Sequence, residues 1–199
     1  MSKAHRKATV RRETKETRIE LTLDLDGTGV TDAATGVGFL DHMLDHLGVH
    51  SVSDLAVRCA GDLEVDDHHT TEDVAICLGE ALAEALGDKA GIRRYGAASV
   101  PMEEALAEVS LDLSGRAAVV FRAEFTGDKI GTFDTQLVEE FLRALARTAG
   151  LNLHVNVPYG ANDHHIAEAI FKAVAQALRA AKSIDPDRKG AVPSTKGRL

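Results

Sequence analysis

The sequence predicts an α+β fold made of two pseudo-symmetric β-β-α-β-α halves, with helices packed against mixed sheets. One observation is a motif that occurs twice, as His68-His69-Thr70-Thr71-Glu72 and as His164-His165-Ile166-Ala167-Glu168, at an offset of 96 residues. Each copy opens a stretch with helical apolar spacing. The order strand–strand–helix–strand–helix also occurs twice, which is typical of helices that cover sheets.

The first half begins with two strands, at 8–14 and 17–25. Ile19, Leu21 and Leu23 alternate with polar residues, and the turn Asp26–Gly29 ends the second strand. Helical spacing follows at 39–49, then a short strand at 54–59. The helix that starts at His68 carries an apolar stripe as far as Leu86, and Gly87 is its expected C-cap.

The second half contains predicted strands at 106–113, 117–125 and 151–157, with helices at 135–149 and 163–181. We expect one domain, 1–199, built of repeat halves at about 8–92 and 98–182. The junction is expected at Gly87–Pro101. The tail, 183–199, contains Pro, Gly and Ser and is expected to be extended.

Composition narrows the class of protein. A net charge of −8 does not favour nucleic-acid binding. Cys59 and Cys77 form no CxxC pair and are expected to be buried free thiols. No apolar run approaches the ~18 residues of a membrane span, and no apolar stretch follows the basic N-terminus. A cytoplasmic enzyme with no membrane partner is the simplest class.

The repeated motif has metal-binding geometry if it lies on a helix. His68 and Glu72 are four residues apart and share a face, while His69 is turned by roughly 100°. Imidazole with carboxylate suits Mn, Fe or Zn. One such copy alone is better explained as a solvated helix start, but two matched copies indicate metal. Two such helices could hold two ions, with each helix contributing to both.

Other polar residues leave alternatives open. His42 precedes His68 by 26 residues and Glu140 precedes His164 by 24, so each could add a ligand. His42 could equally be a polar residue on an apolar helix, and Glu140 a surface acid. The roles of three further histidines are not distinguished by spacing: His46, His50 and His154.

Several charged or polar positions are ambiguous on their own. Glu16, Arg94 and Arg116 are ordinary charges near element boundaries. The segment Ser194–Gly197 could wrap a phosphate with hydroxyls, backbone N–H groups and an ammonium, or could be a flexible tail.

Taken together, the motifs resemble one family over nearly the whole chain, from about Ala8 to Gly197: imidazoleglycerol-phosphate dehydratase of histidine biosynthesis. The motifs that carry the resemblance are Leu25–Gly29, Phe39–Leu44, Asp66–Asp73, Ser110–Arg116, Asp163–Glu168 with Phe171-Lys172, and Pro193–Gly197.

The resemblance implies a hydro-lyase with a ribosomal protein S5 domain 2-like fold and a substrate-binding tail at 183–199. It would dehydrate D-erythro-imidazole glycerol phosphate to imidazole acetol phosphate through a metal-bound imidazolate. It also implies two Mn²⁺ per active site, and a 24-mer whose sites lie between neighbouring subunits. The alternative is a dinuclear metal phosphohydrolase, which would release phosphate instead of water.

The resemblance also implies roles for individual residues. The implied metal ligands are His42, His68, His69, Glu72, His164, His165 and Glu168. Many members carry His at the position of Glu140, so Glu140 or a water takes that place. The implied catalytic residues are Glu16, as the base, with Glu72 and Glu168. The implied substrate and phosphate contacts are Glu16, Arg94, Arg116, Lys172, Ser194, Thr195 and Lys196.

Overall fold

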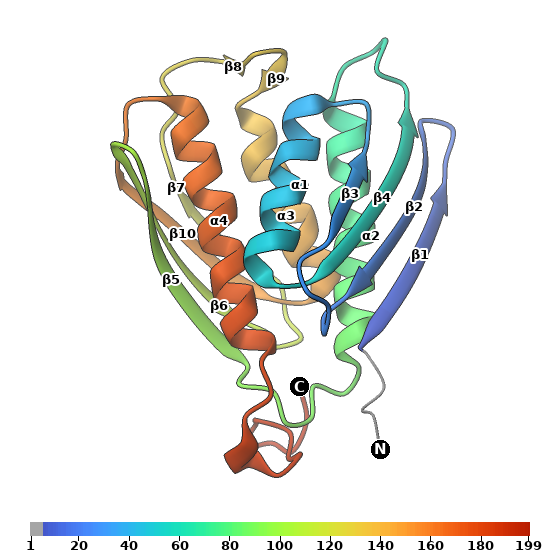
Figure 1. Cartoon of the computed structure of the whole chain (residues 1–199), viewed down its shortest axis with the longest axis vertical. Coiled ribbons are helices and arrows are strands. Elements are labelled where there is room, and N and C mark those ends of the chain that lie inside the picture. The colour runs from blue at the N-terminus through green and yellow to red at the C-terminus, as the bar shows by residue number, and fades with distance from the viewer. Residues whose placement is uncertain (1–5) are drawn as a thin grey trace.

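Two halves with the same order of main elements form the fold in the computed structural model, which describes residues 6–199 (Figure 1). The first half contains β1 (Lys7–Glu13), β2 (Thr17–Asp24), β3 (Thr31–Ala34), α1 (Gly38–Ser51), β4 (Asp54–Gly61) and α2 (His68–Leu86). The second half contains β5 (Tyr95–Met102), β6 (Ala105–Asp112), β7 (Ala118–Arg122), the short hairpin β8 (Lys129–Ile130) and β9 (Phe133–Asp134), α3 (Gln136–Ala149), β10 (Asn152–Tyr159) and α4 (Asp163–Lys182). The predicted α+β class is confirmed.

The two main sheets have the same topology. Their strand orders are β1-β2-β4-β3 and β5-β6-β10-β7. β3 pairs with β4, and β7 with β10, in parallel, while the other neighbours in these sheets are antiparallel. A helix connects each parallel pair, since a parallel connection needs a crossover. The mixed sheets are therefore the product of one repeated unit.

Helices α1 to α4 lie between the two sheets, as Figure 1 shows. Along β2, the side chains of Ile19, Leu21 and Leu23 are buried while Glu20 is exposed, so one face of the strand packs on helices. The helices also pair across the halves: α1 packs against α4, and α2 against α3. The helix layer thus belongs to both halves at once.

The structure corrects the expected junction and adds two strands to the main sheets, besides the unpredicted hairpin of β8 and β9. β5 (Tyr95–Met102) occupies part of the segment expected to be a junction, and β3 was not predicted. Both are edge strands. β5 contains Gly96 and Pro101, which weaken a strand signal, and β3 lacks alternating large apolar residues.

The C-terminal tail is folded back rather than extended. It contains a 3₁₀ turn at Pro186–Arg188, and its backbone pairs with the segment before β5. Gly91 donates to the Ala191 carbonyl at 3.0 Å and accepts from Asp185 at 2.8 Å. The tail therefore lies at the C-terminal end of α4, at the bottom of Figure 1. Among the described residues, no helix is both long and apolar enough to span a bilayer.

A close approach between β5 and α4 depends on a glycine. A Cβ placed on Gly96 would lie 1.9 Å from the carbonyl oxygen of Ala177, which is a backbone atom of α4. The helix cannot move aside easily, because its other side packs against α1. Only glycine fits this position without a shift of the whole helix.

Replacing Gly96 by alanine is therefore expected to lower the free energy of unfolding by about 3 kcal/mol, as overpacking does in a rigid core. Chemical denaturation of the two proteins measures the difference. Gly38→Ala is the matched control, because a Cβ there meets nothing within 4 Å. Equal stability of Gly96→Ala and the parent chain would contradict this account of the packing.

Candidate metal centre

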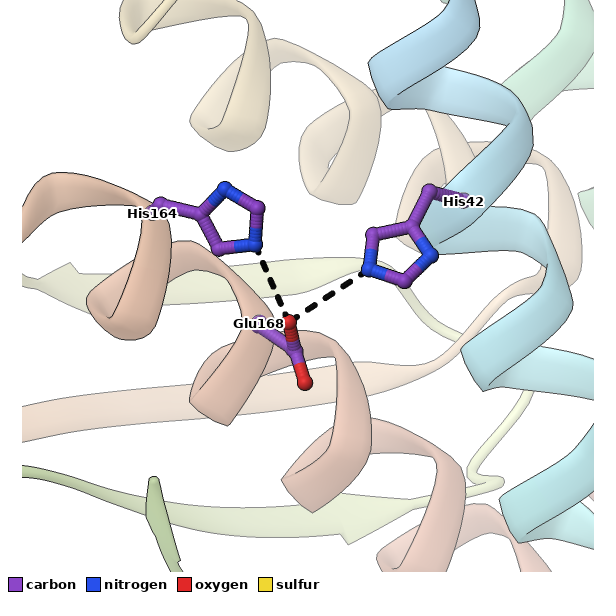
Figure 2. A group of neighbouring side chains, drawn as sticks. All are labelled: His42, His164 and Glu168. Carbon is purple, nitrogen blue, oxygen red and sulfur yellow. Dashed lines mark hydrogen bonds and ion pairs between the residues drawn. The ribbon is translucent and has the colours of Figure 1, made fainter. Parts of the chain in front are cut away.

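The first candidate cluster joins α4 to α1 (Figure 2). His164 and Glu168 lie one turn apart on α4, and His42 faces them from α1. Glu168 Oε2 lies 3.1 Å from His164 Nε2 and 3.4 Å from His42 Nε2. Two imidazoles and a carboxylate from opposite halves of the chain therefore converge on one point.

Glu168 is held as a carboxylate inside this cluster. Its side chain is only 7% exposed, and its Oε1 lies 2.5 Å from Lys172 Nζ and 3.3 Å from His46 Nε2. Burial opposes ionisation, but the hydrogen bond from Lys172 and the nearby imidazoles outweigh it and hold the pKa of Glu168 at about 2. Burial lowers the pKa of His46 to about 4, so this ring is neutral at pH 7.

The second candidate cluster joins α2 to α3. It contains His68 and Glu72 from α2 with Glu140 from α3. His68 Nε2 lies 4.0 Å from Glu72 Oε2, and Arg147 of α3 forms an ion pair with Glu72 at 3.0 Å. Glu140 is the fifth residue of α3, as His42 is of α1, so the pseudo-symmetry of the halves extends to the side chains.

The size and chemistry of both clusters fit a divalent cation. In each, one ligand atom from every residue lies within 4.8 Å of the others. Ligands about 2.1 Å from a shared ion fall within this range. Nitrogen and carboxylate donors without thiolate suit Mn, Fe or Zn. His42, His164 and Glu168 would hold one ion, and His68, Glu72 and Glu140 the other.

His69 and His165 lie outside these clusters, although both are predicted ligands. Their rings are nearly perpendicular to those of His68 and His164, at 86° and 85°. Within the described part of one chain, each motif helix therefore contributes to one cluster only. The second histidine of each motif faces a different direction, as the 100° helical step requires.

Carboxylates surround these two outlying histidines. Asp62 Oδ2 lies 3.0 Å from His69 Nδ1, and Glu104 Oε2 lies 2.7 Å from His165 Nδ1. The hydrogen bond with Asp62 raises the pKa of His69, and the one with His165 holds the pKa of Glu104 at about 2. Glu16, at the turn between β1 and β2, lies 3.9 Å from His69 Nε2.

Short polar interactions fix the start of each motif helix. Asn162 caps α4 by accepting from the backbone N–H groups of His164 and His165 at 2.9 and 3.4 Å. Asp66 accepts from the His68 N–H at 2.8 Å. These contacts satisfy free N–H groups at the helix ends and so hold the histidines at defined places.

The predicted phosphate residues lie at the opposite end of the helices. Arg94 donates its backbone N–H to the Ala181 carbonyl, 13 residues and roughly 20 Å along α4 from Glu168. Its guanidinium pairs with Asp112 at 2.7 and 3.0 Å and donates to the Pro193 carbonyl of the tail at 2.9 Å.

Arg116 and the end of the tail lie at this same end. A Cβ on Gly115 would lie 3.1 Å from the carbonyl carbon of Leu199. Ser194 accepts from the Lys196 N–H at 3.2 Å, and Thr195, Lys196 and Arg116 are exposed. Lys172, predicted to bind phosphate, instead lies beside Glu168. Within one chain, these phosphate residues, except Lys172, therefore lie far from both clusters.

Comparison with known proteins identifies the family. The family model described as imidazoleglycerol-phosphate dehydratase matches residues 35–178. A protein of that name from Rhodopseudomonas palustris (strain TIE-1) is 60% identical over 194 residues, which are 98% of this chain and 98% of the relative. One from Dinoroseobacter shibae is 59% identical over 194 residues, 98% of this chain and 100% of the relative.

Solved structures agree. The crystal structure of imidazoleglycerol-phosphate dehydratase from Staphylococcus aureus is 40% identical, with a TM-score of 0.82, over 90% of this chain and 99% of that chain. The enzyme from Pyrococcus furiosus is 36% identical, with a TM-score of 0.80, over 96% of this chain and 100% of that chain. Sequence and fold thus lead to one conclusion: the chain belongs to the imidazoleglycerol-phosphate dehydratase family.

Proposed function

We propose that the two histidine–carboxylate clusters are the metal sites with which this hydro-lyase of L-histidine biosynthesis acts. The reaction converts D-erythro-imidazole glycerol phosphate to imidazole acetol phosphate with loss of water. The observation that supports the assignment is the matched pair of clusters: at the starts of α2 and α4, a histidine and a glutamate four residues apart meet a side chain from the neighbouring helix. A single cluster would be weaker support, because histidine and acid often meet at a surface.

We assign two Mn²⁺ ions to each active site, on the donor chemistry of the clusters. When bound, Mn²⁺ supplies Lewis acidity that favours the imidazolate form of the substrate ring. The carboxylates of Glu168 and Glu72 would be ligands to the ions. In the metal-free chain, Lys172 pairs with Glu168 and Arg147 pairs with Glu72.

Glu16 is proposed as the general base. The product requires hydroxide to leave the carbon attached to the ring and a proton to leave the neighbouring carbon. Glu16 is half-exposed and lies near His69 Nε2, so a substrate held beside that imidazole would be within reach of its carboxylate. Glu16 also makes no side-chain hydrogen bond within residues 6–199, which leaves its oxygens free to accept the proton.

The phosphate would be held by Arg94, Arg116 and the tail residues Ser194, Thr195 and Lys196. Guanidinium and ammonium groups bind phosphate oxygens directly, and the turn at Ser194–Gly197 adds backbone N–H groups. The hydrogen bond from Arg94 to the Pro193 carbonyl, next to Ser194 in the chain, supports this assignment. Binding the phosphate fixes the rest of the substrate chain and so contributes to orientation.

The separation of the two groups of residues supports a site shared between copies of the chain. We propose assembly as a 24-mer, in which the phosphate residues of one subunit meet the clusters of a neighbour. His69 and His165 would then complete the metal coordination of neighbouring subunits. We also propose that the chain forms a single catalytic domain, 1–199, and acts in the cytoplasm.

The direct test is turnover by protein stripped of metal with a chelator, with and without added Mn²⁺. Formation of imidazole acetol phosphate only after Mn²⁺ addition is the expected result. Release of inorganic phosphate would instead favour a dinuclear hydrolase. Full turnover by the stripped protein would reject the metal assignment.

A further inference from the structure

The second histidine of each motif contacts an acid that no sequence pattern linked to it. His69 Nδ1 lies 3.0 Å from Asp62, and His165 Nδ1 lies 2.7 Å from Glu104. In both halves the contact is made by Nδ1, which leaves Nε2 facing away from the acid. The same arrangement in two halves, built from acids at different places in the sequence, indicates a shared requirement.

Backbone hydrogen bonds hold both acids in place. The backbone N–H of Asp62 donates to the Glu16 carbonyl at 3.0 Å, and the Asp62 carbonyl accepts from Val65 at 2.8 Å. The Glu104 carboxylate accepts from the N–H groups of Ala161 and Asn162 at 3.2 and 2.7 Å. The Glu104 carboxylate cannot turn away from His165 without losing these bonds, whereas at Asp62 the bonds fix the backbone from which the carboxylate reaches His69.

A carboxylate hydrogen-bonded to Nδ1 determines whether Nε2 carries a hydrogen or a lone pair. It favours the tautomer with hydrogen on Nδ1, because only that hydrogen can be donated to the acid. The lone pair is then on Nε2, where a metal ion can bind. Acids placed this way around metal-binding histidines also fix the ring orientation and raise its basicity.

We propose that Asp62 and Glu104 are positioning residues that prepare Nε2 of His69 and Nε2 of His165 for metal binding. The proposal rests on the proposed function in one respect, that His69 and His165 bind metal. It goes further by assigning the control of their tautomer and direction to two residues outside the motif.

The two halves differ in how they provide the acid. In the second half, Glu104 comes from the turn between β5 and β6, while in the first half Asp62 comes from the loop after β4. The first half uses its equivalent turn, between β1 and β2, to place Glu16 near Nε2 of His69 instead. The first half therefore has an acid on each side of its histidine, one for positioning and one for chemistry.

The test is a Mn²⁺ titration of metal-stripped protein, with free Mn²⁺ followed by electron paramagnetic resonance. Asp62→Ala and Glu104→Ala are each expected to weaken one class of Mn²⁺ site by about 10- to 100-fold and to spare the other. The double variant should weaken both classes. Asp62→Asn and Glu104→Gln keep an acceptor oxygen and are expected to lose less affinity than the alanine variants.

Glu64→Ala and Glu103→Ala are the matched controls, because these acids are exposed neighbours with the same charge. They should bind Mn²⁺ as the parent chain does. Glu104 also anchors the α4 start, so the unfolding midpoint of each metal-free variant is compared with the parent. Within residues 6–199 the Asp62 carboxylate hydrogen-bonds only to His69, so its variants separate positioning from stability.

Unchanged Mn²⁺ affinity in both alanine variants would overturn the proposal, as would an equal loss in the controls. A parent chain that binds no Mn²⁺ would overturn it too. If Mn²⁺ binding depends on Asp62 and Glu104 but the loaded parent does not dehydrate the substrate, the positioning role stands and the proposed catalytic use of the metal sites fails. If the loaded parent dehydrates the substrate normally but the variants bind Mn²⁺ as the parent does, the proposed function stands and the positioning role fails.

Discussion

Glu16→Gln is expected to lower kcat by about a hundred- to ten-thousand-fold while Mn²⁺ affinity and KM stay close to those of the parent chain. General bases contribute rate factors of that size. The amide has nearly the same shape as the carboxylate but does not accept a proton at neutral pH. An effect confined to kcat would indicate a group that acts in the transition state.

The surroundings of Glu16 indicate that this substitution should not disturb the fold. Its side chain is 53% exposed, and within residues 6–199 its one ion pair is with His69, at 3.9 Å. The backbone N–H of Glu16 is already satisfied by Thr14 at 3.1 Å, so the turn does not depend on the carboxylate. A change in turnover would therefore reflect chemistry and not folding.

Steady-state kinetics with saturating Mn²⁺ give kcat and KM separately, and the Mn²⁺ titration gives metal affinity. Glu13→Gln is the control, since Glu13 is an exposed acid at the end of β1 and undergoes the same change. Turnover at the parental rate in Glu16→Gln would assign the base to another residue.

Glu168→Ala is expected to abolish detectable turnover and to weaken one class of Mn²⁺ site by more than about 100-fold. This acid is the shared partner of His42 and His164, so its removal takes away the centre of the cluster. Loss of a direct ligand should cost more than the 10- to 100-fold typical of a residue behind a ligand.

The same substitution is expected to lower the free energy of unfolding of the metal-free chain by about 1–3 kcal/mol, because it leaves Lys172, only 19% exposed, without its carboxylate. Glu168→Gln keeps the volume and separates the packing contribution from the charge. Glu84→Ala, an exposed acid on α2, is the control for net charge. Parental Mn²⁺ binding by Glu168→Ala would exclude the α1–α4 cluster as a metal site.

The helices and strands that could be predicted from the sequence are those in which apolar residues recur at regular spacing. α2 starts at the first residue of the motif and α4 one residue before it, and the stripe from Val74 to Leu86 marks the buried side of α2. β5 lacks such a period, because glycine is required at position 96 where the strand meets α4, and Pro101 is tolerated only because the strand is at an edge. This is why β5 was expected to be a junction.

The sequence predicted the histidine–glutamate pair within each motif better than the residues that other elements bring to it. The i, i+4 spacing places Glu168 beside His164 on any α-helix. His42 and Glu140 join the clusters because α1 packs on α4 and α2 packs on α3. These contacts between the halves cannot be predicted from the periodicity of either helix. The contact of Glu104 with His165 spans 61 residues and joins a strand turn to a helix start. No spacing rule links such positions.

The distance between the phosphate residues and the clusters has a genetic consequence. If each site takes the tail of one subunit and the ligands of another, a defect in either region damages a different partner at the site. Lys196→Ala and Glu168→Ala chains, each poorly active alone, should complement one another when coexpressed. Random assembly would leave about one quarter of the sites with both intact regions. Two defective alleles would then support growth without histidine where neither does alone.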